Sequence, residues 1–194
     1  MARPREFDEE AALDAATHCF WKRGYEASST RNLAEQMGIT SASLYNAYGD
    51  KRALYRVVLD RYANKAMGWC ASALSANQPG GPALEAFFAA LVAETLSDGE
   101  ARGCLVVNAG LETAPSDPDF QQVVAQVFAR IETLMAACVA RGQEDGSISR
   151  AQPSEDLARL LLGAMLGLRV LARARADRPL VEGMMRSIAL LVRT

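Results

Sequence analysis

Residues 29–51 constrain the fold of this chain more than any other segment. Ser29 is placed to cap a short helix that ends at Gly38, and Thr40 or Ser41 is placed to cap a second one that ends by Gly49. Gly38 can adopt a positive φ without a Cβ penalty, so the chain can turn sharply between the two helices. The segment therefore predicts a tight pair of short helices.

The two faces of this helix pair differ in chemistry. Leu33, Ala34, Ile39 and Leu44 are placed to bury against the preceding helix, whose apolar positions include Leu13, Ala16 and Phe20. The other face of residues 41–48 carries small, hydroxyl and amide side chains, with no charge. Such a face suits a helix lying in the major groove of DNA, where Asn46 can pair with adenine and the Ala42 methyl group can contact thymine.

Helical periodicity and capping residues continue through the rest of the chain, so we expect an all-α protein of nine helices. A break at residues 78–82 follows the fourth helix, which links an N-terminal three-helix unit (residues 1–50) to a larger body (residues 51–194). The expected helices span residues 8–24, 29–37, 41–48, 51–74, 82–97, 101–113, 117–144, 154–175 and 178–193.

Composition narrows the class of protein. The 194 residues are 50% hydrophobic and carry a net charge of −2, and residues 1–65 hold ten basic against nine acidic side chains, a local balance of +1. That surplus does not indicate nucleic-acid binding by itself. Four widely spaced cysteines, no signal peptide and no membrane-spanning run predict a cytoplasmic protein with reduced thiols and no membrane partner. With His18 as the single histidine, we expect no catalytic triad, metal site or cofactor.

The segment Ser29–Lys51 resembles the TetR family of repressors. The shared positions are Thr30-Arg31-Asn32-Leu33-Ala34, Gly38-Ile39, Leu44-Tyr45, Tyr48 and Lys51, and Phe20 and Gly24-Tyr25 also fit. The resemblance implies a homodimer with an N-terminal helix-turn-helix domain and a divergent C-terminal ligand-binding and dimerisation domain.

Position by position, the resemblance and the chemistry of the polar face give a set of candidate DNA contacts. Base contacts are expected from the small side chains, Asn46 and Arg31, and phosphate contacts from Thr30, the tyrosines and Lys51. The candidates are Thr30, Arg31, Thr40, Ser41, Ala42, Ser43, Tyr45, Asn46, Tyr48 and Lys51. Ala47 and Ser41 depart from the family pattern, where larger or basic residues that contact phosphate are common. Arg3 and Arg5 could compensate as a minor-groove arm, or they could form a solvated tail.

The last two helices are strongly apolar on one face, and the resemblance predicts that they form a four-helix dimer interface. Gly163 and Gly167, four residues apart, would let a neighbouring helix approach closely. Ordinary core packing is the alternative for some of these positions. The interface candidates are Leu157, Leu161, Met165, Leu168, Val181, Met184, Ile188 and Leu191.

A pocket for an unidentified small-molecule inducer is expected among the helices between residues 82 and 175. Its candidate lining is Phe87, Phe88, Cys104, Asn108, Phe128, Met135 and Met165, most of which could equally be core. Cys104 is also a candidate redox or electrophile sensor, because Arg102 and a helix start favour the reactive thiolate, and residues 102–109 resemble a TetR subgroup with sensing cysteines. An inert buried thiol is the alternative.

The function expected from these features is transcriptional repression. A homodimer would bind a palindromic operator, and an inducer or modification of Cys104 would release it by tilting helix 51–74. Activation remains open, because it depends on where the operator lies. The rival interpretation is a helical protein–protein interaction or enzyme module whose helix pair is purely structural; it would not need an exposed polar face at residues 41–48.

Overall fold

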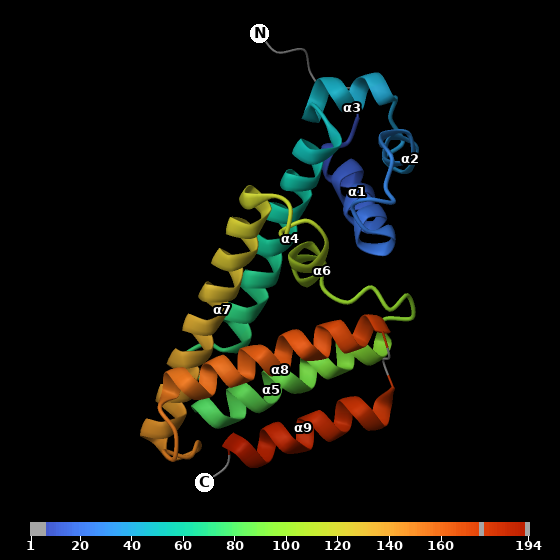
Figure 1. The fold of residues 1–194 in the computed structure, drawn as a ribbon. Helices are drawn as coiled ribbons and strands as arrows, with labels where there is room; N and C mark the ends of the chain where they lie inside the picture. The colour runs from blue at the N-terminus through green and yellow to red at the C-terminus, as the bar shows by residue number, and fades with distance from the viewer. Residues whose placement is uncertain (1–6, 175–176, 193–194) are drawn as a thin grey trace.

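The computed structural model describes residues 7–174 and 177–192. Within these ranges the chain forms helices and no strand, in the predicted order, so the all-α prediction is confirmed (Figure 1). The helices are α1 (Glu9–Arg23), α2 (Thr30–Gln36), α3 (Ser41–Tyr48), α4 (Lys51–Ala73), α5 (Gly80–Ser97), α6 (Leu105–Glu112), α7 (Pro118–Asp145), α8 (Ser154–Ala174) and α9 (Arg178–Val192). Arg3 and Arg5 lie outside the described residues.

Helices α1, α2 and α3 form a small head at one end of the molecule (Figure 1). The predicted caps are present: the Asn32 N–H donates to Ser29 Oγ at 3.2 Å, and the Ser43 N–H donates to Thr40 Oγ1 at 3.0 Å. Gly38 adopts a φ of 68°, which turns the chain between α2 and α3. Caps and turn therefore fix the two short helices as the sequence predicts.

The inner sides of α2 and α3 close the core of this head. Leu33 and Leu44 are 0% exposed, and Phe20 of α1 is 1% exposed. Removing such side chains from water is the main favourable term for helices too short to be stable alone. One apolar cluster therefore stabilises the head, and the side chains on its outer surface are not needed for this packing.

Helix α4 runs from the head into the body (Figure 1). Tyr55, 1% exposed, lies at the junction and packs its ring against Phe20 of α1 at 4.8 Å, Tyr25 at 4.8 Å and Phe120 of α7 at 5.2 Å, measured between ring centroids. Aromatic pairs at these separations are stabilising beyond the area they bury. One tyrosine therefore joins three helical elements from both parts of the molecule.

Helix α7 is the central helix of the body and packs against α4, α5, α6 and α8. By length and composition it could cross a membrane. Its apolar residues are instead those of a core helix: Val127 and Ile131 are 6% exposed, and Met135 and Val139 are 0% exposed. The apolar character of α7 is therefore explained by packing inside the body.

Glycines allow the backbones of α5 and α7 to come into direct contact. A Cβ added at Gly80 would lie 2.3 Å from the backbone nitrogen of Gly142 and 2.4 Å from the carbonyl oxygen of Cys138, both on α7. The end of α7 also caps the start of α5, because the Gly80 N–H donates to Asp145 Oδ2 at 2.9 Å and the Gly81 N–H donates to Ser147 Oγ at 2.8 Å. These bonds explain why α5 begins at Gly80, two residues before the expected start at residue 82.

The expected helix at residues 101–113 begins only at Leu105. Ala101 and Gly103 have φ angles of 50° and 68°, which are incompatible with a right-handed helix. Asp98 holds this loop, since its carboxylate accepts from the backbone N–H of Arg102 at 2.7 Å and from its Nε at 3.1 Å. Cys104 is therefore the N-cap residue of α6 rather than a residue inside the helix.

We predict that Gly80→Ala lowers the free energy of unfolding by about 1–3 kcal/mol, because the new methyl group must displace the backbone of α7. Urea denaturation followed by circular dichroism measures this change. Gly68→Ala in α4 is the matched control: nothing lies within 4 Å of a Cβ placed there, so we expect unchanged or slightly raised stability, by up to about 1 kcal/mol. Equal losses for both variants would contradict the close approach of α5 and α7.

Candidate DNA-binding surface and adjoining cavities

The outer edge of α3 faces solvent. Tyr45 is 51% exposed, and Ser41, Ala42 and Asn46 are exposed while Ser43 is half-buried. The Thr40 and Ser43 hydroxyl oxygens lie 2.9 Å apart at the start of the helix. The edge is therefore a row of small and uncharged polar groups on a helix whose opposite side is buried.

Tyr48 does not belong to this edge, so the expectation of an exposed Tyr48 is wrong. It is 9% exposed and its hydroxyl oxygen is buried. The reason is helical geometry: Tyr48 comes one turn after Leu44, so it lies on the same inner face. Its ring belongs to the apolar core of the molecule.

The cations beside the edge differ in how they are held. Arg31 is exposed on α2. The Lys51 ammonium donates to the Tyr25 carbonyl oxygen at 3.1 Å and lies 4.1 Å from the centre of the Tyr25 ring. Arg52 binds Asp117 at 2.7 Å through Nε and also binds Asp119, which ties α4 to the start of α7 and raises the pKa of the guanidinium. Lys51 is therefore held in position by Tyr25, whereas Arg52 ties α4 to α7 at the junction between head and body.

Several polar contacts fasten α1 and the following loop to the body. The Trp21 indole N–H donates to the Gly103 carbonyl oxygen at 3.1 Å, and the Arg102 guanidinium lies 4.5 Å from the centre of the Trp21 ring. The Glu26 N–H donates to Glu112 Oε1 of α6 at 3.0 Å. The loop before α6 and the end of α6 are therefore in direct contact with the head.

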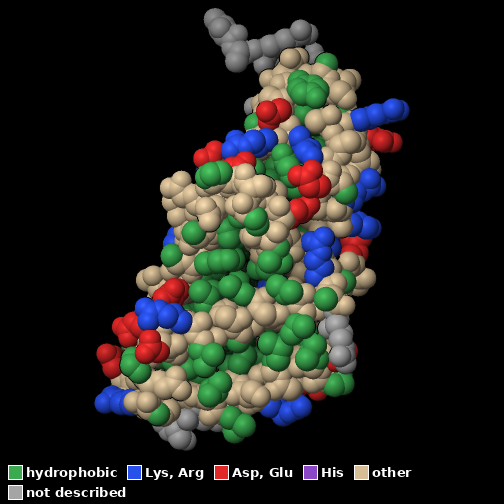
Figure 2. Space-filling view, in the orientation of Figure 1, with side chains coloured by type: hydrophobic (Ala, Val, Ile, Leu, Met, Phe, Trp, Pro, Cys, Tyr) green, Lys and Arg blue, Asp and Glu red, His purple; other side chains and the backbone are tan. Residues whose placement is uncertain are grey.

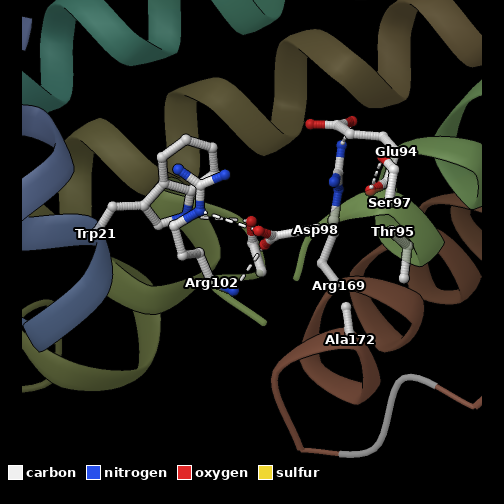
Figure 3. A pocket seen from close by; sticks show the side chains of 9 residues that line it. Trp21, Glu94, Thr95, Ser97, Asp98, Arg102, Arg169 and Ala172 are labelled. Atoms are coloured by element: carbon white, nitrogen blue, oxygen red, sulfur yellow. Dashed lines mark hydrogen bonds and ion pairs between the residues drawn. The ribbon is translucent and has the colours of Figure 1, made fainter. Parts of the chain in front are cut away.

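A cavity of about 630 Å³ lies between α1, α4, α5 and α8. A smaller cavity of about 120 Å³ adjoins it and shares four of its lining residues (Figure 3). Together they are lined by Asp14, Thr17, His18, Trp21, Arg61, Tyr62, Lys65, Ala66, Trp69, Glu94, Thr95, Ser97, Asp98, Arg102, Gly103, Arg169 and Ala172. Both tryptophans of the chain belong to this lining.

The expected pocket lining contributes to neither of these cavities. Phe87, Phe88 and Met135 are 0% exposed and Met165 is 6% exposed, and all four belong to the apolar core. Phe128 packs half-buried against that core, and the Asn108 side-chain amide donates to the Arg102 carbonyl oxygen at 3.0 Å. We therefore correct the expected lining: its apolar members are packing residues, and the cavities open beside α1 instead.

Cys104 is half-buried, whereas Cys19, Cys70 and Cys138 are buried. Burial raises the pKa of the Tyr62 hydroxyl, and the neighbouring Cys104 thiol raises it further. Burial also raises the pKa of Cys70 to about 11. Cys104 is thus the most accessible thiol of the chain and lies at the loop that contacts α1.

The expected dimer-interface residues largely face the core of their own chain. Leu157, Leu161, Met165, Leu168, Val181 and Ile188 are 0–8% exposed, while Met184 is half-buried and Leu191 is 44% exposed. Along α8 the outward apolar side chains are Leu160 and Val170, 47% and 41% exposed. The correction follows from amphipathicity: the residues with the strongest apolar periodicity are those that bury against the protomer itself.

The outward sides of α8 and α9 nevertheless form an apolar surface. Figure 2 shows hydrophobic side chains gathered over the part of the molecule where Figure 1 places these helices. Gly163 and Gly167 belong to α8, and nothing lies within 4 Å of a Cβ placed at either position. On α9, Leu190 and Leu191 are 78% and 44% exposed. This surface is an apolar part of the body that a single protomer leaves uncovered.

Sequence reasoning missed the residues that line the cavities, above all Tyr62, Thr95 and Arg169. None of the three carries a local sequence pattern that indicates a ligand site. They meet only because α4, α5 and α8 pack together with α1. No group of three or more histidine, cysteine or acidic side chains that could hold a metal ion occurs in the described parts of the chain.

Comparisons with known proteins agree with this architecture. Residues 12–58 match the N-terminal region of the bacterial regulatory proteins of the tetR family, and residues 80–188 match the tetracyclin repressor-like C-terminal domain. The HTH-type transcriptional repressor ComR of Escherichia coli is 30% identical over 90% of this chain and 84% of its own length. The repressor DhaR of a Mycobacterium species is 29% identical over 80% of this chain and 77% of its own length.

Solved structures give the same result. A cysteine mutant of the TetR family regulator CifR, complexed with a 26-bp operator duplex, is 29% identical, covers 98% of this chain and 100% of its own, and superposes with a TM-score of 0.85. The reduced form of NemR of E. coli is 17% identical and covers 95% of this chain and 96% of its own, with a TM-score of 0.85, so it supports the fold alone. The family matches cover both the head and most of the body, and this chain belongs to the TetR family.

Proposed function

We propose that this protein is a homodimeric, sequence-specific DNA-binding repressor whose α3 reads base edges in the major groove. The observation that carries the proposal is the outward polar edge of α3, held on a rigid head by the buried Leu33 and Leu44. The rival interpretation, a structural helix pair in an interaction or enzyme module, gives no reason for that edge to be free. The repressor names of its relatives and the operator complex of CifR support the same function.

Different residues have different roles in this proposal. Short side chains at Ser41, Ala42 and Ser43 let the helix backbone lie deep in the groove, and Asn46 can bind an adenine edge with two hydrogen bonds. Exposed Arg31 is suited to guanine, and Tyr45, Thr30, Thr40 and Lys51 are suited to phosphate. Because Lys51 is already held by Tyr25, its ammonium would bind phosphate from a fixed position. Such a regulator acts in the cytoplasm, where the DNA is.

We predict that Asn46→Ala relaxes base preference at particular operator positions, at a cost of about 1–3 kcal/mol there. Tyr45→Phe should instead weaken binding to all duplexes by about 1 kcal/mol, the loss of one phosphate hydrogen bond. Operators are first selected from random duplex DNA, and affinities are then measured by fluorescence anisotropy on selected and scrambled duplexes. Asn64→Ala, an exposed asparagine on α4, is the matched control and should change neither. A uniform loss for Asn46→Ala would contradict base readout.

Dimerisation is proposed through the outward faces of α8 and α9. Leu160, Gly163, Gly167 and Val170 recur every three or four residues, so they share one side of α8. Open space above the two glycines would admit a partner helix at close range. DNA reading also needs two heads, because half-sites in successive major grooves lie about 34–36 Å apart.

We predict that Gly167→Arg converts the dimer to a monomer and abolishes tight operator binding, because a long cation would occupy the space a partner helix needs. Size-exclusion chromatography with light scattering measures the mass, and circular dichroism checks folding. Ala125→Arg, on an exposed position of α7, should leave a dimer. A wild-type particle of one-chain mass at micromolar concentration would refute the interface.

Release from DNA is proposed to follow ligand binding in the body or modification of Cys104. The loop that carries Cys104 also supplies the Gly103 carbonyl oxygen that accepts from Trp21 of α1. A change at this loop therefore acts directly on a head–body contact. It releases DNA only if the modified or liganded form favours a different head separation, since a ligand shifts a conformational equilibrium only by its difference in affinity for the two states.

We predict that Cys104 reacts with N-ethylmaleimide before the other three cysteines, because they are 0–4% exposed whereas Cys104 is half-buried. Peptide mass spectrometry after timed quenching gives the order of labelling. Operator affinity of the singly labelled protein should fall, and Cys104→Ser should bind DNA normally and resist the reagent. Undiminished affinity after complete labelling of Cys104 would remove it from the release mechanism.

A further inference from the structure

The two cavities beside α1 together form a site with a narrow polar end and a wide aromatic end. The inner cavity, of about 120 Å³, and the outer one, of about 630 Å³, share Trp21, Glu94, Arg102 and Arg169. Figure 3 shows Trp21 and Arg102 on one side of the inner cavity and Glu94, Thr95 and Arg169 on the other. The outer volume lies within the range of about 300–1,000 Å³ found for small-molecule sites.

Thr95 gives the inner cavity an unsatisfied hydroxyl. It is 4% exposed, and its Oγ1 has no hydrogen-bond partner among the described residues. A threonine in a helix commonly bonds to a carbonyl of the preceding turn, and Thr95 does not. The oxygen is itself buried, so an occupant of the cavity bonds to it by displacing the side chains that cover it. Such a bond removes the cost of a buried polar atom without a partner.

Arg169 gives the same cavity a buried cation. Its side chain is 12% exposed, and its Nη2 donates to Glu94 at 2.7 Å, a carboxylate that is itself half exposed. A guanidinium has five N–H donors, so one such bond leaves most of its donor capacity for a ligand. Thr95 and Arg169 therefore offer a hydroxyl and a charge from neighbouring helices α5 and α8.

The outer cavity adds aromatic walls and further positive charge. Trp21, Tyr62 and Trp69 line it, and planar ligands stack on such rings. Its lining has four cations (Arg61, Lys65, Arg102 and Arg169) against two acids (Asp14 and Glu94). Arg61 pairs with Asp14 and with Glu10, whereas no carboxylate in the described chain pairs with Lys65. Arg102 pairs with Asp98 and Arg169 pairs with Glu94, so Lys65 is the cation of this lining that favours an anion.

We propose that this site binds a small planar aromatic carboxylic acid. The carboxylate lies in the inner cavity, where the Thr95 hydroxyl and the Arg169 guanidinium donate to its oxygens, and the ring lies between the aromatic walls of the outer cavity. Charge-assisted hydrogen bonds are the stronger kind, so they account for affinity as well as orientation. A neutral amide of the same shape satisfies the hydroxyl but loses the charge.

The regulatory meaning of this site rests on the proposed function as a DNA-binding repressor. Trp21 and Arg102 line both cavities, and they also make the contacts that fasten α1 to the body. An acid seated against them competes with Glu94 for Arg169 and contacts the head directly. The ligand therefore acts at the contact between head and body, and no conformational change has to be transmitted through the core of the body.

The test is isothermal titration calorimetry of the full chain without DNA, using benzoate, cinnamate and indole-3-acetate as probes and their primary amides as controls. We expect at least one acid to bind at least about tenfold more tightly than its amide, as loss of a hydrogen-bonded charge implies. Thr95→Val, which removes only the hydroxyl, should weaken that acid about tenfold while raising the melting temperature of the unliganded protein. A purely structural Thr95 would not give these opposite changes.

Arg169→Gln should also weaken the acid at least tenfold, and Arg130→Gln, an exposed arginine on α7, is its matched control. Circular dichroism establishes that each variant is folded. No binding by any of the three acids, equal binding of acids and amides, or full affinity in Thr95→Val would overturn the proposal. Binding is measured without DNA, so failure here is distinct from failure of the selected duplexes to bind the protein, which would refute repression instead.

Discussion

The arrangement of this molecule depends on the contacts of the buried Tyr55 ring. Its ring touches Phe20 of the head, Tyr25 of the loop that follows α1, and Phe120 of α7. The same junction is reinforced outside the core by Arg52 with Asp117 and Asp119. Buried rings set the distance between head and body, and the exposed ion pairs contribute less, because solvent screens them.

Local chemistry explains why the helix order could be predicted from the sequence. Ser29, Thr40 and Asp50 act through bonds to backbone groups three residues away, and Gly38 acts through its own φ. Such features need no knowledge of the rest of the fold. The start of α6 was misplaced because its determinant, the bonding of Asp98 to Arg102 around a positive φ at Ala101, depends on a loop conformation that helical periodicity does not encode.

The candidate sites were predicted unevenly for the same reason. The polar edge of α3 follows from spacing along a single helix, and only Tyr48 was assigned to the wrong side. The lining of the cavities requires α1, α4, α5 and α8 to be placed together, so no periodicity could indicate Thr95 or Arg169. For α8, apolar spacing identified a helix with a buried face but could not say that its second face, at Leu160 and Val170, remains exposed.

The position of the two tryptophans has an optical consequence. Trp21 and Trp69 are the only indoles in the chain. Both line the larger cavity, Trp21 from α1 of the head and Trp69 from α4. Tryptophan fluorescence of the unlabelled protein therefore originates entirely beside this cavity. Any event that hydrates, quenches or rigidifies those rings changes the tryptophan emission and is detected without a dye. Events confined to the outward faces of α8 and α9 should leave this emission unchanged.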